Sequence, residues 1–211
     1  MRFLSIALSL FVLSTVLPTI YAAPCQKEGC SLHHATHIPA GTTLTIDSKV
    51  AVIGAQLTTP ADDKLCTVYR LASWDGKKNP TPGYVVKIFD LKSITKEEIE
   101  GLKRVGQYIA VDEKQKALVM REAQGETLDK LLAKHRILDK ELHEKWIPKI
   151  AAEAAHIAKH CGIYHSDLND GNIVIDMKTE KVTLIDWEYY IKDGDKGFMS
   201  DVEDIKEYLA S

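Results

Sequence analysis

Side chains able to do acid–base and metal chemistry gather near the end of the chain. Asp167 and Asn172 stand five residues apart in the short segment YHSDLNDGN, and Asp186 follows further on. One carboxylate could take the proton of a hydroxyl, while an amide and a second carboxylate offer the hard oxygen atoms that magnesium prefers. Phosphoryl transfer from ATP needs these groups and a lysine that fixes the phosphates.

A hairpin is predicted to bring these groups together. The runs 172–176 and 181–185 are strand-like, and the turn-like residues 177–180 separate them. Because the second strand of a hairpin returns beside the first, we expect Asp186 to lie next to Asn172. The residue types would then supply one carboxylate for a hydroxyl, and one amide and one carboxylate for a metal ion.

The rest of the chain predicts an α+β fold. Strand-like runs occupy 43–53, 66–71, 84–89 and 117–120. A helix begins after Ser93 or Thr95, which can cap it, with acidic residues in its first turn. From Leu128 the spacing becomes helical. The apolar positions of 139–161 follow helical spacing, with Pro148 predicted to bend or split the helix and Gly162 to end it.

Three motifs in this order resemble the protein-kinase-like superfamily. The segment HSDLNDGN at 165–172 resembles the kinase catalytic loop. DWE at 186–188 stands where the family has Asp-Phe-Gly, and VVK at 85–87 looks like the lysine motif of the third strand. The resemblance covers about Ile46 to the end of the chain. It implies a bilobal fold with a small antiparallel N-lobe, about 43–121, and a reduced, mainly helical C-lobe, about 122–211.

The resemblance also implies roles for single residues. Asp167 would be the catalytic base, Asn172 and Asp186 would bind Mg²⁺, and Lys87 would hold the phosphates of ATP. A helix glutamate would pair with Lys87. Glu98 fits best because apolar residues follow it on the buried side; Glu97 and Glu100 remain alternatives. The segment MREAQGETL at 120–128 resembles the hinge between lobes, where Glu122 and Ala123 would meet adenine through their backbone.

The branch of the superfamily stays open at this point. Gly171 and the run IDWEY at 185–189 resemble the aminoglycoside and choline kinases, whereas QGETL at 124–128 fits the atypical protein kinases equally well. The acceptor would be a protein serine or threonine first, and a small-molecule alcohol second.

The chain departs from the kinase pattern in two places. No glycine-rich run precedes Lys87, and 55–64 contains no glycine, so backbone amides would approach phosphate less closely. No Ala-Pro-Glu motif follows Asp186; 200–209 could supply one short helix. A secreted pseudokinase that acts as a binding module is therefore the alternative to an enzyme.

The N-terminal residues resemble a secretory signal peptide. Arg2 precedes the apolar run Phe3–Val16, then Pro18 and the small residues Ala22 and Ala23 follow. We expect residues 1–22 to be removed, the protein to be secreted, and no membrane association after cleavage. Residues 23–42 read as an irregular segment. Its histidines at 33, 34 and 37 lack a supporting carboxylate or thiol, so we expect a solvated segment without metal.

The four cysteines and the net charge lead to two further expectations, on disulfide bonds and on partners. An exported chain with four cysteines permits disulfides, and Cys25 with Cys30 is the favoured pair. Cys161 reads either as a buried free thiol or as the partner of Cys66. The formal net charge of -3 gives no argument for a nucleic-acid partner.

Export is directly testable. The mature chain should be recovered from the culture medium of an expressing cell with its amino terminus near Ala23, because the apolar run is short and small residues follow it. Amino-terminal sequencing of the secreted protein is the measurement. Secreted material that retains Met1 would contradict the prediction.

Overall fold

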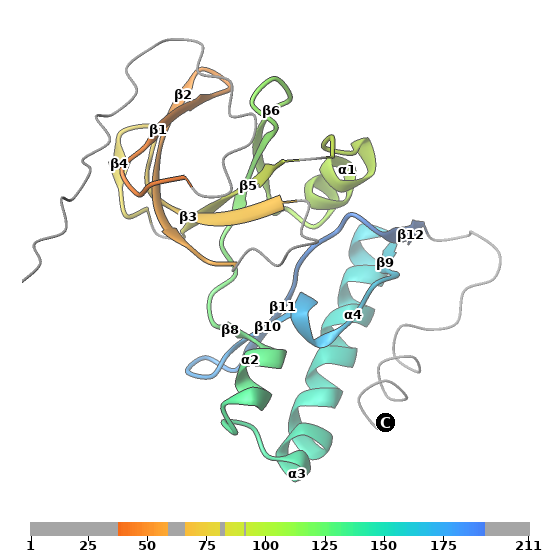
Figure 1. Cartoon of the computed structure of the whole chain (residues 1–211). Coiled ribbons are helices and arrows are strands. Elements are labelled where there is room, and N and C mark those ends of the chain that lie inside the picture. Colours follow the sequence, from red (N-terminus) through yellow and green to blue (C-terminus); the bar gives the residue numbers. More distant parts are fainter. Residues whose placement is uncertain (1–37, 59–65, 81–82, 91, 193–211) are drawn as a thin grey trace, which may run out of the picture. The chain divides into compact units, whose positions relative to one another are not determined.

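The structure is a computed structural model that describes residues 38–58, 66–80, 83–90 and 92–192 (Figure 1). All of these residues fall in one compact unit. The strands are β1 (Thr43–Ile46), β2 (Lys49–Gln56), β3 (Cys66–Trp74), β4 (Lys77–Lys78), β5 (Tyr84–Phe89), β6 (Tyr108–Asp112), β7 (Ala117–Arg121), β8 (Glu126–Thr127), β9 (Ile163–His165), β10 (Ile173–Asp176), β11 (Lys181–Leu184) and β12 (Tyr190–Lys192). The α-helices are α1 (Lys96–Arg104), α2 (Leu128–Ala133), α3 (Asp139–Glu141) and α4 (Ile147–Cys161). The predicted α+β bilobal, kinase-like fold is confirmed.

The N-terminal lobe is an antiparallel sheet with the strand order β1-β2-β3-β5-β7-β6, and β4 pairs with β3 (Figure 1). The prediction of one continuous run over 43–53 was wrong. Asp47 and Ser48 have φ values of 49° and 61°, and this left-handed turn reverses the chain between β1 and β2. Both are short polar residues, which tolerate that conformation better than β-branched ones.

Residues before β1 also pack on the sheet. The Ile38 side chain is buried, and its backbone N–H donates to the hydroxyl of the buried Tyr69 at 3.0 Å. Irregular chain thus continues to Thr42, as the sequence suggests, but its described part contributes to the core of the N-terminal lobe.

Helix α1 has the cap that the sequence predicts. The Thr95 side chain accepts a hydrogen bond from the Glu98 N–H at 3.1 Å, and Glu97 and Glu98 lie in the first turn near the positive end of the helix dipole. Gly101 sits in the middle of the helix where a Cβ atom would lie 2.7 Å from the carbonyl oxygen of Trp187. A glycine is therefore required there for the helix to approach the segment that follows Asp186.

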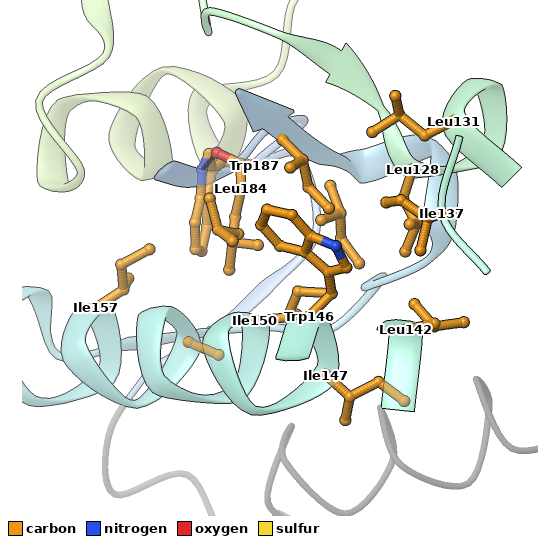
Figure 2. Packing of buried hydrophobic residues seen from close by; sticks show 14 of the residues in the cluster. Leu128, Leu131, Ile137, Leu142, Trp146, Ile147, Ile150, Ile157, Leu184 and Trp187 are labelled. Atoms are coloured by element: carbon orange, nitrogen blue, oxygen red, sulfur yellow. Dashed lines mark hydrogen bonds between the residues drawn. The ribbon is translucent and has the colours of Figure 1, made fainter. Parts of the chain in front are cut away.

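The core of the C-terminal lobe is built on one face of α4 and on α2 (Figure 2). Its side chains are large and apolar, and the fully buried Trp146 and Trp187 belong to it. The helical run starting at Asp139 is split, as predicted, but by a π-helical turn over Leu142–Trp146 rather than at the proline itself. Pro148 lies in the first turn of α4, directly after this π-helical turn, and Gly162 ends the helix at φ 66°.

Two short sheets complete this lobe. β10 pairs with β11 in the predicted hairpin and with β8 on its other side. β12 pairs antiparallel with β9, so that Tyr190 lies opposite His165. The chain therefore returns after Asp186 to run beside β9, the strand that leads into the loop with Asp167 and Asn172.

The disulfide between Cys66 and Cys161 is not formed. Both are half-buried free thiols that pack against the core, and burial raises the pKa of the Cys66 thiol, which keeps it protonated. The pair Cys25 and Cys30, the signal peptide, the histidines at 33–37 and the helix expected at 200–209 lie outside the described residues. Within the described ranges, no helix is both long and apolar enough to cross a bilayer.

Candidate active site

The loop after β9 holds Asp167 beside Asn172. The Asn172 side-chain N–H₂ donates to the Asp167 backbone carbonyl at 2.8 Å and to its carboxylate at 3.3 Å. The Asn169 side chain donates to the other carboxylate oxygen at 3.3 Å and accepts from the Gly171 N–H at 3.0 Å. Asp167 is exposed, whereas Asn172 is buried and Asn169 is half-buried, so two amide side chains orient a carboxylate that faces solvent.

The hairpin β10–β11 brings Asp186 to this loop. The Ile185 N–H donates to the Asn172 carbonyl at 2.9 Å, which sets the next residue, Asp186, beside the loop. Asp186 adopts a left-handed backbone with φ 64°, a conformation that aspartate tolerates better than most residues. Its side chain is 43% exposed, so it is available to a ligand.

Lys87 on β5 joins the two lobes at this point. Its Nζ lies 2.8 Å from Glu98 Oε1 on α1 and 2.7 Å from Asp186 Oδ1. Burial disfavours the ammonium, but the carboxylates of Asp186 and Glu98 outweigh this effect and raise the pKa of Lys87. Lys87 is therefore a permanent cation. Of the three helix glutamates considered above, the structure pairs Glu98 with it.

Glu98 is a buried carboxylate with only one of its two oxygen atoms hydrogen-bonded. Its side chain is 2% exposed, and its second oxygen, Oε2, is buried without a hydrogen-bond partner among the described residues. Burial raises the pKa of the Glu98 carboxyl, and the Lys87 ammonium opposes that rise. The ion pair therefore depends on the close approach of α1 to β5.

His165 connects the loop that holds Asp167 to the Asp186 segment. Its Nε2 lies 2.8 Å from the Ile185 carbonyl oxygen, and the Asp167 N–H donates to its Nδ1 at 3.3 Å. A carbonyl can only accept and an N–H can only donate, so the neutral imidazole with the proton on Nε2 satisfies both bonds. Its ring meets Trp187 edge-on, and burial lowers the pKa of His165, which favours this neutral form.

The segment that joins the two lobes is anchored at Glu122. The Glu122 N–H donates to the Gly83 carbonyl at 2.9 Å, and the Glu122 carboxylate binds Arg70, so the amide of Glu122 is not available to adenine. Among the residues that the structure describes, the backbone N–H and C=O of Ala123 have no hydrogen-bond partner. Contact of the Glu122 and Ala123 backbone with adenine stays a prediction. Gly125 then passes so close to β10 that a Cβ atom would lie 2.2 Å from the Ile175 oxygen.

The sequence did not reveal three side chains that hold parts of the site in place. Asn169 orients Asp167, as described above. The Gln107 side-chain N–H₂ donates to the Leu184 carbonyl at 2.8 Å, which ties β6 to the end of β11. Glu188, adjacent to the motif aspartate, forms an ion pair with Lys92. Only Glu188 had a sequence signal, because it occupies the position of the kinase-motif glycine.

Magnesium fits the oxygen atoms of this site. Asn172 uses its side-chain N–H₂ within the loop, and Asp186 uses Oδ1 for Lys87, so an amide oxygen and Asp186 Oδ2 stay without a protein partner in the described ranges. Nowhere in those ranges do three or more His, Cys, Asp or Glu side chains cluster as a metal site. Two oxygen donors suit magnesium, which commonly keeps several waters and takes phosphate oxygens as further ligands.

Comparison with known proteins identifies a family and a fold for this chain. A family model described as the RIO domain matches residues 68–210. The solved structures that resemble the chain include vaccinia related kinase 3 (16% identity, TM-score 0.52, covering 74% of this chain and 53% of that one). They also include the Cydia pomonella granulovirus kinase PK-1 (16% identity, TM-score 0.53, covering 70% of this chain and 57% of that one). The chain thus spans little more than half of either kinase, and these likenesses concern the fold. No curated protein matches.

The neutral His165 predicts a pH dependence of stability. Below about pH 6.5 the unfolded chain binds a proton at this position, whereas the folded chain resists it until its lowered pKa is reached. The free energy of unfolding should therefore fall as pH decreases through this window, by up to about 1.4 kcal/mol per pH unit from this group. Urea denaturation at several pH values between 7.5 and 5 measures it.

The variant His165→Gln should lose this component of the slope, because glutamine does not titrate. His143→Gln is the matched control, since His143 is exposed, and it should keep the wild-type slope. Identical slopes for wild type and His165→Gln would contradict the assignment.

Proposed function

We propose that this chain, which belongs to the RIO domain family of atypical protein kinases, transfers the γ-phosphate of ATP to a hydroxyl group. One observation carries the proposal. Lys87, Glu98 and Asp186 converge from β5, α1 and the end of the β10–β11 hairpin beside the loop that holds Asp167 and Asn172. A lysine, a general base and two oxygen donors are the parts that phosphoryl transfer requires.

Asp167 would act on the acceptor. Its carboxylate is exposed and is oriented by two amide side chains, so it can accept the proton of an incoming hydroxyl. The acceptor oxygen then forms a bond to the γ-phosphorus, while the bond to the bridging oxygen of the leaving ADP breaks. The proton goes to Asp167 and the negative charge leaves with ADP.

Lys87 would hold the phosphates of ATP in place. Its charge is assured by two carboxylates, and Glu98 keeps the side chain extended toward Asp186. Asn172 and Asp186 would hold Mg²⁺ through oxygen atoms, and this ion would neutralise charge on the phosphates when bound. Ala123 would meet adenine through its backbone, whose N–H and C=O have no partner within the described ranges.

The acceptor is a protein serine or threonine in our proposal, because the family match supports the atypical protein kinases over a small-molecule kinase branch. Export of the mature chain is part of the same proposal and rests on the N-terminal sequence alone. One observation favours a pseudokinase as second candidate: the segment 55–64 lacks the glycines that would let backbone amides approach phosphate.

Nucleotide binding separates these candidates. ATP with Mg²⁺ should raise the melting temperature of the mature chain, since a ligand that binds only the folded state stabilises it. At a concentration 100-fold above Kd the stabilisation is about 2.7 kcal/mol, or roughly 5–10 °C for a chain of this size. A thermal shift assay with and without magnesium measures it.

Asp186→Asn should remove most of the magnesium-dependent part of the shift, because the variant loses the charged donor. Asp75→Asn, in an exposed turn, is the control and should keep the full shift. If the wild-type chain shows no shift at millimolar ATP, the phosphotransferase proposal fails and the pseudokinase remains.

Turnover tests the role of Asp167. Asp167→Ala should lose about a hundredfold to ten-thousandfold in rate, the usual contribution of a general base, while keeping its ATP-dependent thermal shift. Asn172 should stay oriented in this variant, because its 2.8 Å hydrogen bond goes to the Asp167 backbone. Lys87→Met should weaken both binding and turnover, since this lysine would contact bound ATP throughout.

Measuring ATP consumption beside melting temperature separates catalysis from stability. If Asp167 only capped a turn, the residual activity of Asp167→Ala would follow its folded fraction. A folded Asp167→Ala protein as active as wild type would remove Asp167 from the mechanism.

A further inference from the structure

Helix α1 is attached along its length to the segment that follows Asp186. The Gly101 backbone lies against Trp187, and Glu100 pairs with Lys192 at 3.3 Å. Just before the helix, Lys92 pairs with Glu188. The segment that carries a proposed magnesium ligand therefore also determines where α1 lies.

The Lys92–Glu188 ion pair is the most sheltered of these charged attachments. The Glu188 side chain is 11% exposed and the Lys92 side chain 25%, whereas Lys192 and Glu100 are 52% and 43% exposed. A sheltered pair is screened less by water and salt than an exposed pair is, so it fixes its partners more firmly.

This ion pair also adjoins the site through Phe89. The Lys92 ammonium lies 5.8 Å from the centre of the Phe89 ring, and the Lys87 ammonium lies 5.3 Å from the same centre. Phe89 is 2% exposed and stands two residues after Lys87 on β5. Movement of Lys92 would therefore disturb the packing next to the Lys87 side chain.

We infer that Lys92 and Glu188 form a positioning pair, which holds α1 in register with Asp186 so that Glu98 stays against Lys87. The pair touches neither ATP nor the acceptor. It acts through the helix, because only two residues separate Lys92 from the Thr95 cap of α1. This inference rests on the proposed function for its catalytic consequence, and on the structure alone for its effect on the helix.

Loss of the pair has a specific consequence. If α1 moves away, Lys87 loses Glu98 and keeps Asp186 as its charged partner. The ammonium would then compete with magnesium for the same carboxylate. A misplacement of about 1 Å can cost about a hundredfold in rate, so kcat should fall about 10- to 100-fold while KM for the acceptor stays unchanged.

A charge exchange tests the inference. Lys92→Glu and Glu188→Lys each create a like-charge contact, whereas the double variant restores an ion pair of opposite direction. Hydrogen exchange of the α1 amides should accelerate in each single variant and return toward wild type in the double variant. kcat should follow the same pattern. Glu188→Gln is the milder variant, should either charge reversal prevent folding.

Lys149→Glu is the matched control. Lys149 and Glu180 form an exposed ion pair between α4 and the β10–β11 turn, and its loss should change neither α1 exchange nor kcat. The amides of α4 serve as an internal reference, because equal acceleration in α4 and α1 would indicate general loosening and overturn the inference.

The outcomes separate this inference from the proposed function. If wild type transfers no phosphate but α1 exchange responds to the pair and recovers in the double variant, the proposed function fails and the helix attachment stands. Unchanged α1 exchange in the single variants, or no recovery in the double variant, overturns the attachment. Recovery of exchange without recovery of kcat overturns the positioning role.

Discussion

A single buried ammonium group constrains this fold. Lys87 lies almost wholly out of water, and an unpaired charge in that position would cost several kcal/mol. The structure meets this constraint with two carboxylates from different parts of the chain, one on α1 and one after β11. The N-terminal sheet, its helix and the C-terminal hairpin must therefore assemble together, since each contributes a group that the others need.

The loop around Asp167 depends indirectly on the same constraint, because it is hydrogen-bonded to the residue that precedes Asp186. His165 accepts from the Asp167 N–H and reaches the carbonyl of Ile185, the residue before Asp186. Asn172 touches Asp167 through its side chain and Ile185 through its backbone. The Asp167 loop and the Asp186 segment are therefore held together by hydrogen bonds, which fix their orientation. The apolar core around Trp146 and Trp187 adds rigidity through packing, which is not directional.

The sequence was sufficient for features that depend on local pattern. Two such features are the β10–β11 hairpin, which follows from the spacing of Asn172 and Asp186, and the Thr95 cap. The structure contains both. The turn at Asp47 and Ser48 was missed because a β-branched run hid two polar residues that adopt positive φ. The Lys92–Glu188 pair joins residues 96 positions apart, which no local periodicity encodes. The hydrogen bond from the Glu122 N–H to the Gly83 carbonyl joins residues far apart in the chain, so only the tertiary structure reveals it.

The short connection between the lobes has mechanical implications. Glu122 is anchored at one end by Gly83 and Arg70, and Gly125 is wedged against β10 at the other. Only Ala123 and Gln124 lie between these two anchors, so their torsion angles set how the chain passes from one lobe to the other. Ala123 is also the residue whose backbone groups have no partner within the described ranges. A molecule that bound those groups would restrain the torsion angles of this short connection, so binding there would also restrict movement of one lobe against the other.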